Sequence, residues 1–131
     1  MINTNFNPLE RMWDFPLAAV HESGLYLMGQ CIFNPFTKEE YYLVKVGKSL
    51  DLYQRLRQYT TPNPQIFLID YLLGKEHYEE ESFYQSIIET ALGGKKYHSR
   101  EWFQVSREVY LKISELKFNL FEIETLMKII K

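Results

Sequence analysis

The fold is decided by residues 41–59, YYLVKVGKSLDLYQRLRQY. The run Tyr41–Val46 is rich in aromatic and β-branched residues, a composition that is typical of a β-strand. Gly47 interrupts this run, and the residues after it predict a short helix that Asp51 can cap. The stretch is therefore expected to form a strand, a tight turn and a helix in that order.

Two basic residues of this stretch are expected to converge. Lys45 lies near the end of the predicted strand, and Arg55 lies on the helix that returns toward that end. A lysine inside an apolar strand is costly unless it faces a polar cleft or a partner, which favours a role in a site. A lysine and an arginine beside a tight turn can together hold a phosphate. The alternatives are a solvated lysine on an edge strand and a surface arginine paired with Asp51.

The other apolar runs extend this unit to an α+β fold, namely a three-stranded antiparallel sheet flanked by helices, with a C-terminal helical extension. The predicted strands are Gly24–Phe33, Tyr41–Val46 and Gln65–Leu73, of which the first two form a hairpin. A further segment, Glu101–Val105, is expected to be a short edge strand or simply extended.

Helical spacing of apolar residues predicts three further helices. They run from about His77 to Leu92, from a cap at Ser106 to about Leu116, and over Phe118–Lys131. We therefore divide the chain into an N-terminal extension at residues 1–23, a central domain at 24–105, and C-terminal helices at 106–131 that pack on the same domain.

Length and composition limit the possible classes of protein. A chain of 131 residues predicts one domain with its own core. The formal net charge of −2 counts against a general nucleic-acid coat but not against an enzyme with a local basic cleft. The single Cys31 permits no internal disulfide. With no signal sequence and no long apolar run, we expect a soluble cytoplasmic protein without a membrane partner.

Four short motifs together resemble the GIY-YIG nuclease superfamily, in particular its phage-type branch, whose second signature reads K-[IV]-G. The first signature matches Gly24-Leu25-Tyr26, and the second matches Lys45-Val46-Gly47. Arg55 and Tyr59 follow Gly47 at the distances found in this family. Glu81 on a helix and the strand Glu101-Trp102-Phe103 complete the pattern.

This resemblance implies a metal-dependent endonuclease that hydrolyses DNA phosphodiester bonds. Tyr26 and Lys45 would activate the attacking water, Arg55 would clamp the phosphate, and Tyr59 would orient the nucleophile or the phosphate. Glu81 would hold Mg²⁺ or Mn²⁺, because one carboxylate with waters and phosphate oxygens can suffice for such ions.

Either of two carboxylates could be the metal ligand. One other position departs from the family pattern. Glu79, Glu80 and Glu81 form an acidic run that a helix dipole alone would favour, and Glu80 is the second choice of ligand. Gln85 stands where many relatives carry a histidine. Gln85 and the acidic net charge favour an alternative, namely an inactive module of phage or mobile-element origin that binds nucleic acid or protein. A purely protein-binding inhibitor or assembly factor is a third class.

Further residues are candidates for contacts with the DNA backbone, although each would look the same as a solvated surface residue. They are Lys48, Arg57, Lys95, Lys96, His98 and Arg100. A protein partner or a homo-oligomer is also compatible with the sequence.

Overall fold

The computed structural model describes residues 22–60, 62, 65–97 and 102–130 of the chain. Its centre is a five-stranded antiparallel sheet with the strand order β3-β1-β2-β5-β4. The strands are β1 (Gly24–Asn34), β2 (Glu39–Ser49), β3 (Phe67–Leu73), β4 (Lys95–Tyr97) and β5 (Trp102–Val105). The predicted α+β class and the hairpin are confirmed, whereas the predicted number of three strands is wrong.

Two of the described helices begin at a residue whose side chain caps them. The helices are α3 (Leu52–Thr60), α4 (Glu80–Thr90), α5 (Arg107–Leu116) and α6 (Ile123–Ile130), with 3₁₀ turns η1 (Lys75–His77) and η2 (Lys117–Phe121). The Asp51 carboxylate accepts a hydrogen bond from the Gln54 amide at 3.0 Å. The Ser106 hydroxyl accepts one from the Val109 amide at 3.2 Å. Both predicted caps are therefore confirmed.

Two of the predicted helices are each divided in the structure. The helix expected from His77 begins instead as η1, and α4 starts only at Glu80. The final helix is split into η2 and α6, because Glu122 between them has an extended backbone with φ −71° and ψ 139°. Apolar spacing continues across both breaks, so periodicity alone could not reveal them.

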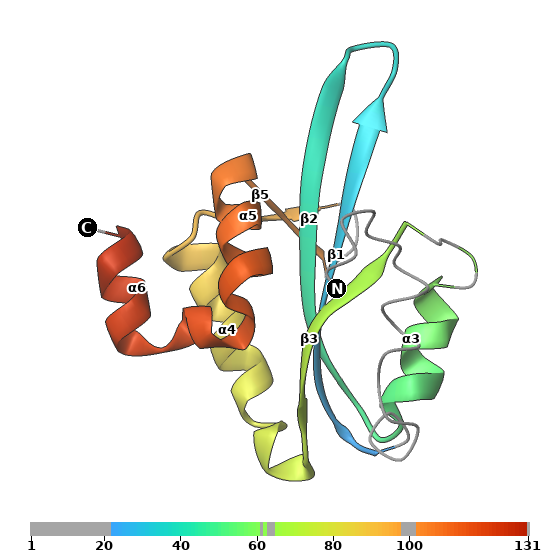
Figure 1. Cartoon of the computed structure of the whole chain (residues 1–131), viewed down its shortest axis with the longest axis vertical. Helices are drawn as coiled ribbons and strands as arrows, with labels where there is room; N and C mark the ends of the chain where they lie inside the picture. The colour runs from blue at the N-terminus through green and yellow to red at the C-terminus, as the bar shows by residue number, and fades with distance from the viewer. Residues whose placement is uncertain (1–21, 61, 63–64, 98–101, 131) are drawn as a thin grey trace, which may run out of the picture.

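The sheet has helices on both of its faces, with α3 on one face and α4, α5 and α6 on the other (Figure 1). Residues alternate between these faces along β2. Leu43 belongs to the apolar cluster beneath α3, and Val44 and Val46 belong to the larger core on the α4 and α5 side. Lys45, by the same alternation, lies on the face covered by α3.

The C-terminal elements contribute to the larger core. Ile113, Phe118 and Leu120 are buried in one cluster with Leu25 and other strand residues. The Phe118 amide also donates a hydrogen bond to the carboxylate of Asp70 on β3 at 3.1 Å. None of the helices in the described residues is long and apolar enough to cross a membrane.

The β1–β2 hairpin extends beyond the rest of the sheet as a two-stranded arm (Figure 1). The pairing of β3 with β1 stops at Gly29, and the pairing of β5 with β2 starts at Tyr42. Phe36 at the turn of the arm is 94% exposed.

Candidate functional site

Three of the predicted catalytic side chains lie together beneath α3. Tyr26 on β1 and Lys45 on β2 are each only 2% exposed. The Lys45 Nζ lies 5.4 Å from the centroid of the Tyr59 ring, and the rings of Tyr26 and Tyr59 are 6.3 Å apart. The Trp102 ring on β5 meets the Tyr59 ring edge-on, with 6.5 Å between the ring centroids. We call these four residues the Lys45 cluster.

The Lys45 cluster holds a cation where the surrounding strand is apolar. Val44 and Val46 on either side of Lys45 are fully buried. Burial of an ammonium group is unfavourable, and the Tyr59 ring face offsets part of this penalty through its quadrupole. The side chain is thus a positive charge held at a fixed place, which is a property that a phosphate site requires.

Gly47 allows the Tyr26 ring to take its position. Gly47 is the cross-strand partner of Tyr26, and a Cβ on Gly47 would overlap the Cζ and Oη atoms of that ring. The Tyr26 side chain therefore lies directly across β2. The glycine after Lys45-Val46 is required by this close approach.

We expect Gly47→Ala to destabilise the protein by about 1–3 kcal/mol, the usual effect of an overpacked site, because the Tyr26 ring must shift. Urea unfolding of Gly47→Ala, Tyr26→Leu and the double variant measures the coupling between the two positions. Alanine should be tolerated better once the ring has been removed, with a coupling energy of about 1 kcal/mol or more. Equal penalties with and without the ring would contradict the close approach.

Arg55 and Arg57 lie on different sides of α3. Arg55 is half-buried and shares a helix face with the buried Leu52 and with Tyr59, since it stands three residues after the first and four before the second. In the described part of the chain, the Arg55 side chain has no hydrogen bond or ion pair. Arg57 is exposed, and its Nη1 donates to the Tyr53 hydroxyl at 3.0 Å.

Glu81 approaches the same end of β2 from the opposite face of the sheet. Its Oε1 lies 3.9 Å from the Nζ of Lys48, the residue that follows Gly47 and points to the α4 side. The Lys48 Nζ also lies 5.5 Å from the centroid of the Tyr78 ring. Glu81 therefore contacts Lys48, and no contact in the described structure joins it to the Lys45 cluster.

The edge of β2 that pairs with β5 lies between the two sheet faces that carry the Lys45 cluster and the Lys48–Glu81 pair. β5 pairs only with Tyr42–Val44, and no described strand pairs with that edge beyond Val44. The Val46 carbonyl accepts a hydrogen bond from the Gln85 Nε2 at 2.9 Å. Gln85 therefore links α4 to β2. The sequence alone shows this residue only as a departure from the GIY-YIG pattern. A single strand edge separates the Lys45 cluster from the Lys48–Glu81 pair.

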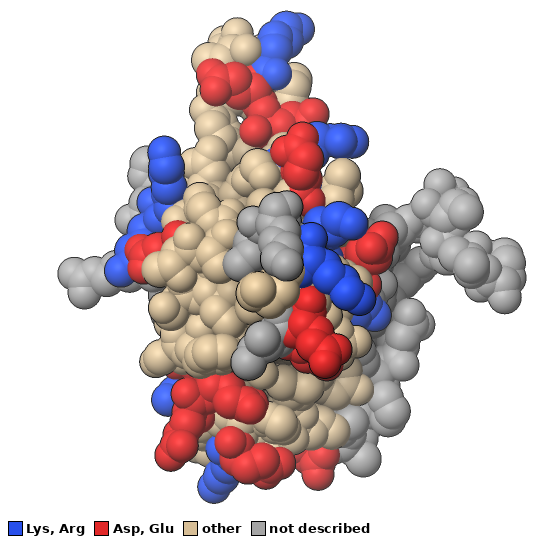
Figure 2. All heavy atoms as spheres, turned by 90° about the vertical axis from the view of Figure 1, so that its left-hand side faces the viewer, with Lys and Arg blue, Asp and Glu red and all other residues tan. Residues whose placement is uncertain are grey.

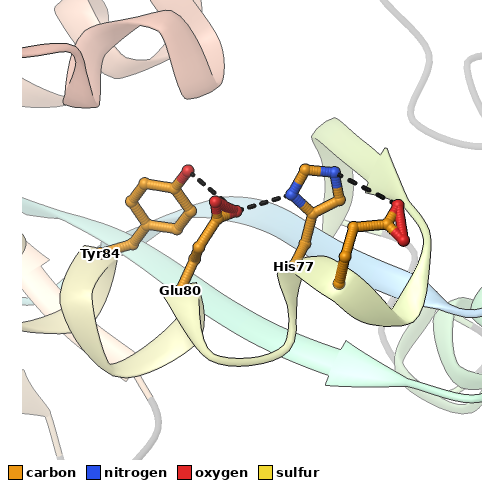
Figure 3. A network of polar contacts seen from close by, with 4 residues as sticks. His77, Glu80 and Tyr84 are labelled. Atoms are coloured by element: carbon orange, nitrogen blue, oxygen red, sulfur yellow. Dashed lines mark hydrogen bonds and ion pairs between the residues drawn. The ribbon is translucent and has the colours of Figure 1, made fainter.

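The alternative ligand, Glu80, contacts His77 on η1 and Tyr84 on α4 (Figure 3). Its Oε1 lies 2.6 Å from the His77 Nδ1 and accepts a hydrogen bond from the Tyr84 hydroxyl at 3.4 Å. Burial, with the nearby Glu80 carboxylate, raises the pKa of Tyr84, so this phenol remains a donor. Among the described residues, no group of three or more His, Cys, Asp or Glu side chains could hold a metal ion. A metal here would therefore have few protein ligands.

The predicted backbone-binding residues do not form one surface in the described structure. Lys95 and Lys96 are exposed on β4, and Lys48 is paired with Glu81. His98 and Arg100 lie outside the described residues. Figure 2 shows the face formed by α4, α5 and α6, where acidic and basic side chains are mixed on a largely uncharged surface. That face offers no extended basic area among the residues drawn in colour.

A comparison with protein-family models matches residues 29–117, more than half of the chain, to the T5orf172 domain. The chain belongs to the T5orf172 family. Searches of curated proteins and of solved structures found no match. Membership of the T5orf172 family supports a phage-associated module of the nuclease-like or DNA-binding kind, with nucleic acid as its partner class.

The assignment to the GIY-YIG superfamily is therefore wrong, because the family model that matches is the T5orf172 domain. The T5orf172 match begins at Gly29 and does not include Gly24-Leu25-Tyr26, on which the resemblance relied. Tripeptide motifs occur by chance on many strands.

Proposed function

We propose that this T5orf172 domain hydrolyses phosphodiester bonds of DNA with the help of Mg²⁺ or Mn²⁺. The observation that carries the proposal is the nearly complete burial of Lys45 against Tyr59, on the face of the sheet that also holds Tyr26. A buried cation surrounded by phenol groups is costly to fold and is suited to a substrate that is an anion.

The scissile phosphate would lie at the outer edge of β2, beside the Lys45 cluster. Lys45 and the guanidinium of Arg55 would neutralise the charge that develops on the phosphate oxygens in the transition state. The planar fork of Arg55 suits two oxygens at once, and no described side chain competes for it. The Tyr26 hydroxyl would orient the attacking water. Tyr59 would position the Lys45 ammonium group.

Glu81 fits the requirements of a hard divalent cation that keeps most of its waters. It supplies a carboxylate at the same strand edge, and its 3.9 Å contact with Lys48 is loose enough to be exchanged. The ion would contribute stabilisation of the leaving oxygen. Lys48 would then be released to contact the DNA backbone. Arg57, Lys95 and Lys96 would contact the same backbone.

We expect nicking of supercoiled plasmid DNA with Mg²⁺ or Mn²⁺ and none in excess EDTA. Glu81→Gln should lower the cleavage rate by at least about a hundredfold, equivalent to about 2.7 kcal/mol. Glu80→Gln is the matched control and should cleave at nearly the normal rate, because Glu80 is occupied by His77 and Tyr84. Undiminished cleavage in EDTA would contradict the metal mechanism. An inactive Glu80→Gln together with an active Glu81→Gln would show that Glu80, and not Glu81, is the metal ligand.

A second candidate function is a nucleic-acid-binding module that does not cleave. It is favoured by the contact of Glu81 with Lys48 and by the net charge of −2. Salt-dependent binding of DNA or RNA without cleavage under any metal condition would select this function.

A further inference from the structure

The sheet face that carries the Lys45 cluster continues past α3 to a second pair of aromatic rings. Tyr97 on β4 is the cross-strand partner of Trp102, and it packs against the apolar cluster beneath α3. Tyr41 lies on β2 with the alternation of Leu43 and Lys45, and so shares this face. The ring centroids of Tyr41 and Tyr97 are 6.2 Å apart, with an angle of 42° between the ring planes.

Tyr41 and Tyr97 leave part of their surface open, since both are half-buried. Gln104, which pairs with Lys95 on β4 and Leu43 on β2, lies on the same face and is also half-buried. Lys95 is exposed on this face, two residues before Tyr97. The patch thus combines aromatic faces, an amide and a cation. We call Tyr41, Tyr97, Gln104 and Lys95 the tyrosine platform.

Charge varies along the tyrosine platform. At its outer end, the Glu39 carboxylate raises the pKa of Tyr41, with burial as a smaller cause, so that phenol stays neutral. At its inner end, Tyr97 pairs with Trp102 and so adjoins the Lys45 cluster. Lys95 pairs with Gln104, opposite Leu43, and so lies between the Tyr41 and Tyr97 positions along the strands. An anionic group is therefore favoured at the inner end, and a neutral group at the outer end.

We propose that the tyrosine platform binds an unpaired nucleobase of the substrate strand, with its phosphate on the side of Lys95. Aromatic rings stack on any base, whereas the bases of a duplex are already stacked on one another. A phosphate on one side of the base can then contact Lys95, and a phosphate on the other side can approach the Lys45 cluster past Tyr97 and Trp102. This inference rests on the proposed function and assigns its substrate class, a nucleic acid with unpaired nucleotides beside the bond that is cut.

The experiment compares binding of three labelled oligonucleotides of about 12 nucleotides by fluorescence anisotropy in Ca²⁺, at fixed salt. They are a single strand, the matching duplex, and a single strand with abasic sites. The variants are Tyr41→Leu/Tyr97→Leu, which keeps apolar volume without rings, and Tyr41→Phe/Tyr97→Phe, which keeps the rings. Phe36→Leu, at the exposed tip of the arm, is the matched control.

The wild-type protein should bind the single strand at least about tenfold more tightly than the abasic strand, since stacking contributes about 1–3 kcal/mol per base. The Leu/Leu variant should lose at least about tenfold in affinity for the single strand only, while the Phe/Phe and Phe36→Leu variants stay close to wild type. Normal binding by Leu/Leu, or a preference for the duplex, would overturn the tyrosine platform and leave the proposed function standing. Failure to bind any nucleic acid would overturn both.

Discussion

Arg55→Ala is expected to lower the rate of phosphodiester cleavage at least about a hundredfold, while Arg57→Ala lowers it by no more than about a few-fold. The two residues are separated by about 200° around α3. Arg55 is half-buried on the side of Leu52 and Tyr59, whereas Arg57 is exposed and already bonded to Tyr53. Single-turnover cleavage of a labelled DNA by the two variants at fixed salt measures the difference.

Two controls test the physical reason for each of these effects. Arg55→Lys should recover little activity, because a point charge does not replace a planar fork that bonds two phosphate oxygens. The small loss from Arg57→Ala should shrink further as salt is raised, since it reflects backbone binding. Loss of cleavage in Arg57→Ala with normal cleavage in Arg55→Ala would place the site on the other side of α3.

The long strands and the caps were predictable from the sequence, and the edge of the sheet was not. β1, β2 and β3 contain extended apolar runs, which give a clear signal. β4 has only three residues, two of which are Lys95 and Lys96, so it looks like a basic connector. Its strand conformation comes from pairing with β5, a tertiary interaction that local sequence does not encode.

The candidate site was predictable in part for a similar reason. A lysine in an apolar strand signalled a special position, and Lys45 is indeed buried beside Tyr59. Which face Glu81 would reach depends on how α4 crosses β2, which spacing along the chain does not determine. Gln85 gave no signal of its link to Val46, because any helix glutamine can remain solvated. The GIY-YIG assignment is wrong because it rests on motifs of only a few residues each, and such motifs recur by chance.

Lys45→Met should reduce cleavage by at least about a hundredfold and leave the protein folded. Lys45 is 2% exposed between buried strand residues, so a long apolar side chain fills the same space without the penalty of a buried charge. The unfolding midpoint in urea should therefore be unchanged or higher. Lys112→Met, at an exposed position on α5, is the matched control and should leave both properties unchanged.

The most direct test of a chemical site beneath α3 is single-turnover cleavage of labelled DNA in Mg²⁺ by wild type, Lys45→Met and Lys112→Met, with urea unfolding of the same samples. If the Lys45 ammonium group takes part in the reaction, Lys45→Met alone should lose cleavage while its stability is kept or raised. Cleavage by Lys45→Met at the wild-type rate would mean that the buried charge has no part in the reaction and that the site does not lie beneath α3.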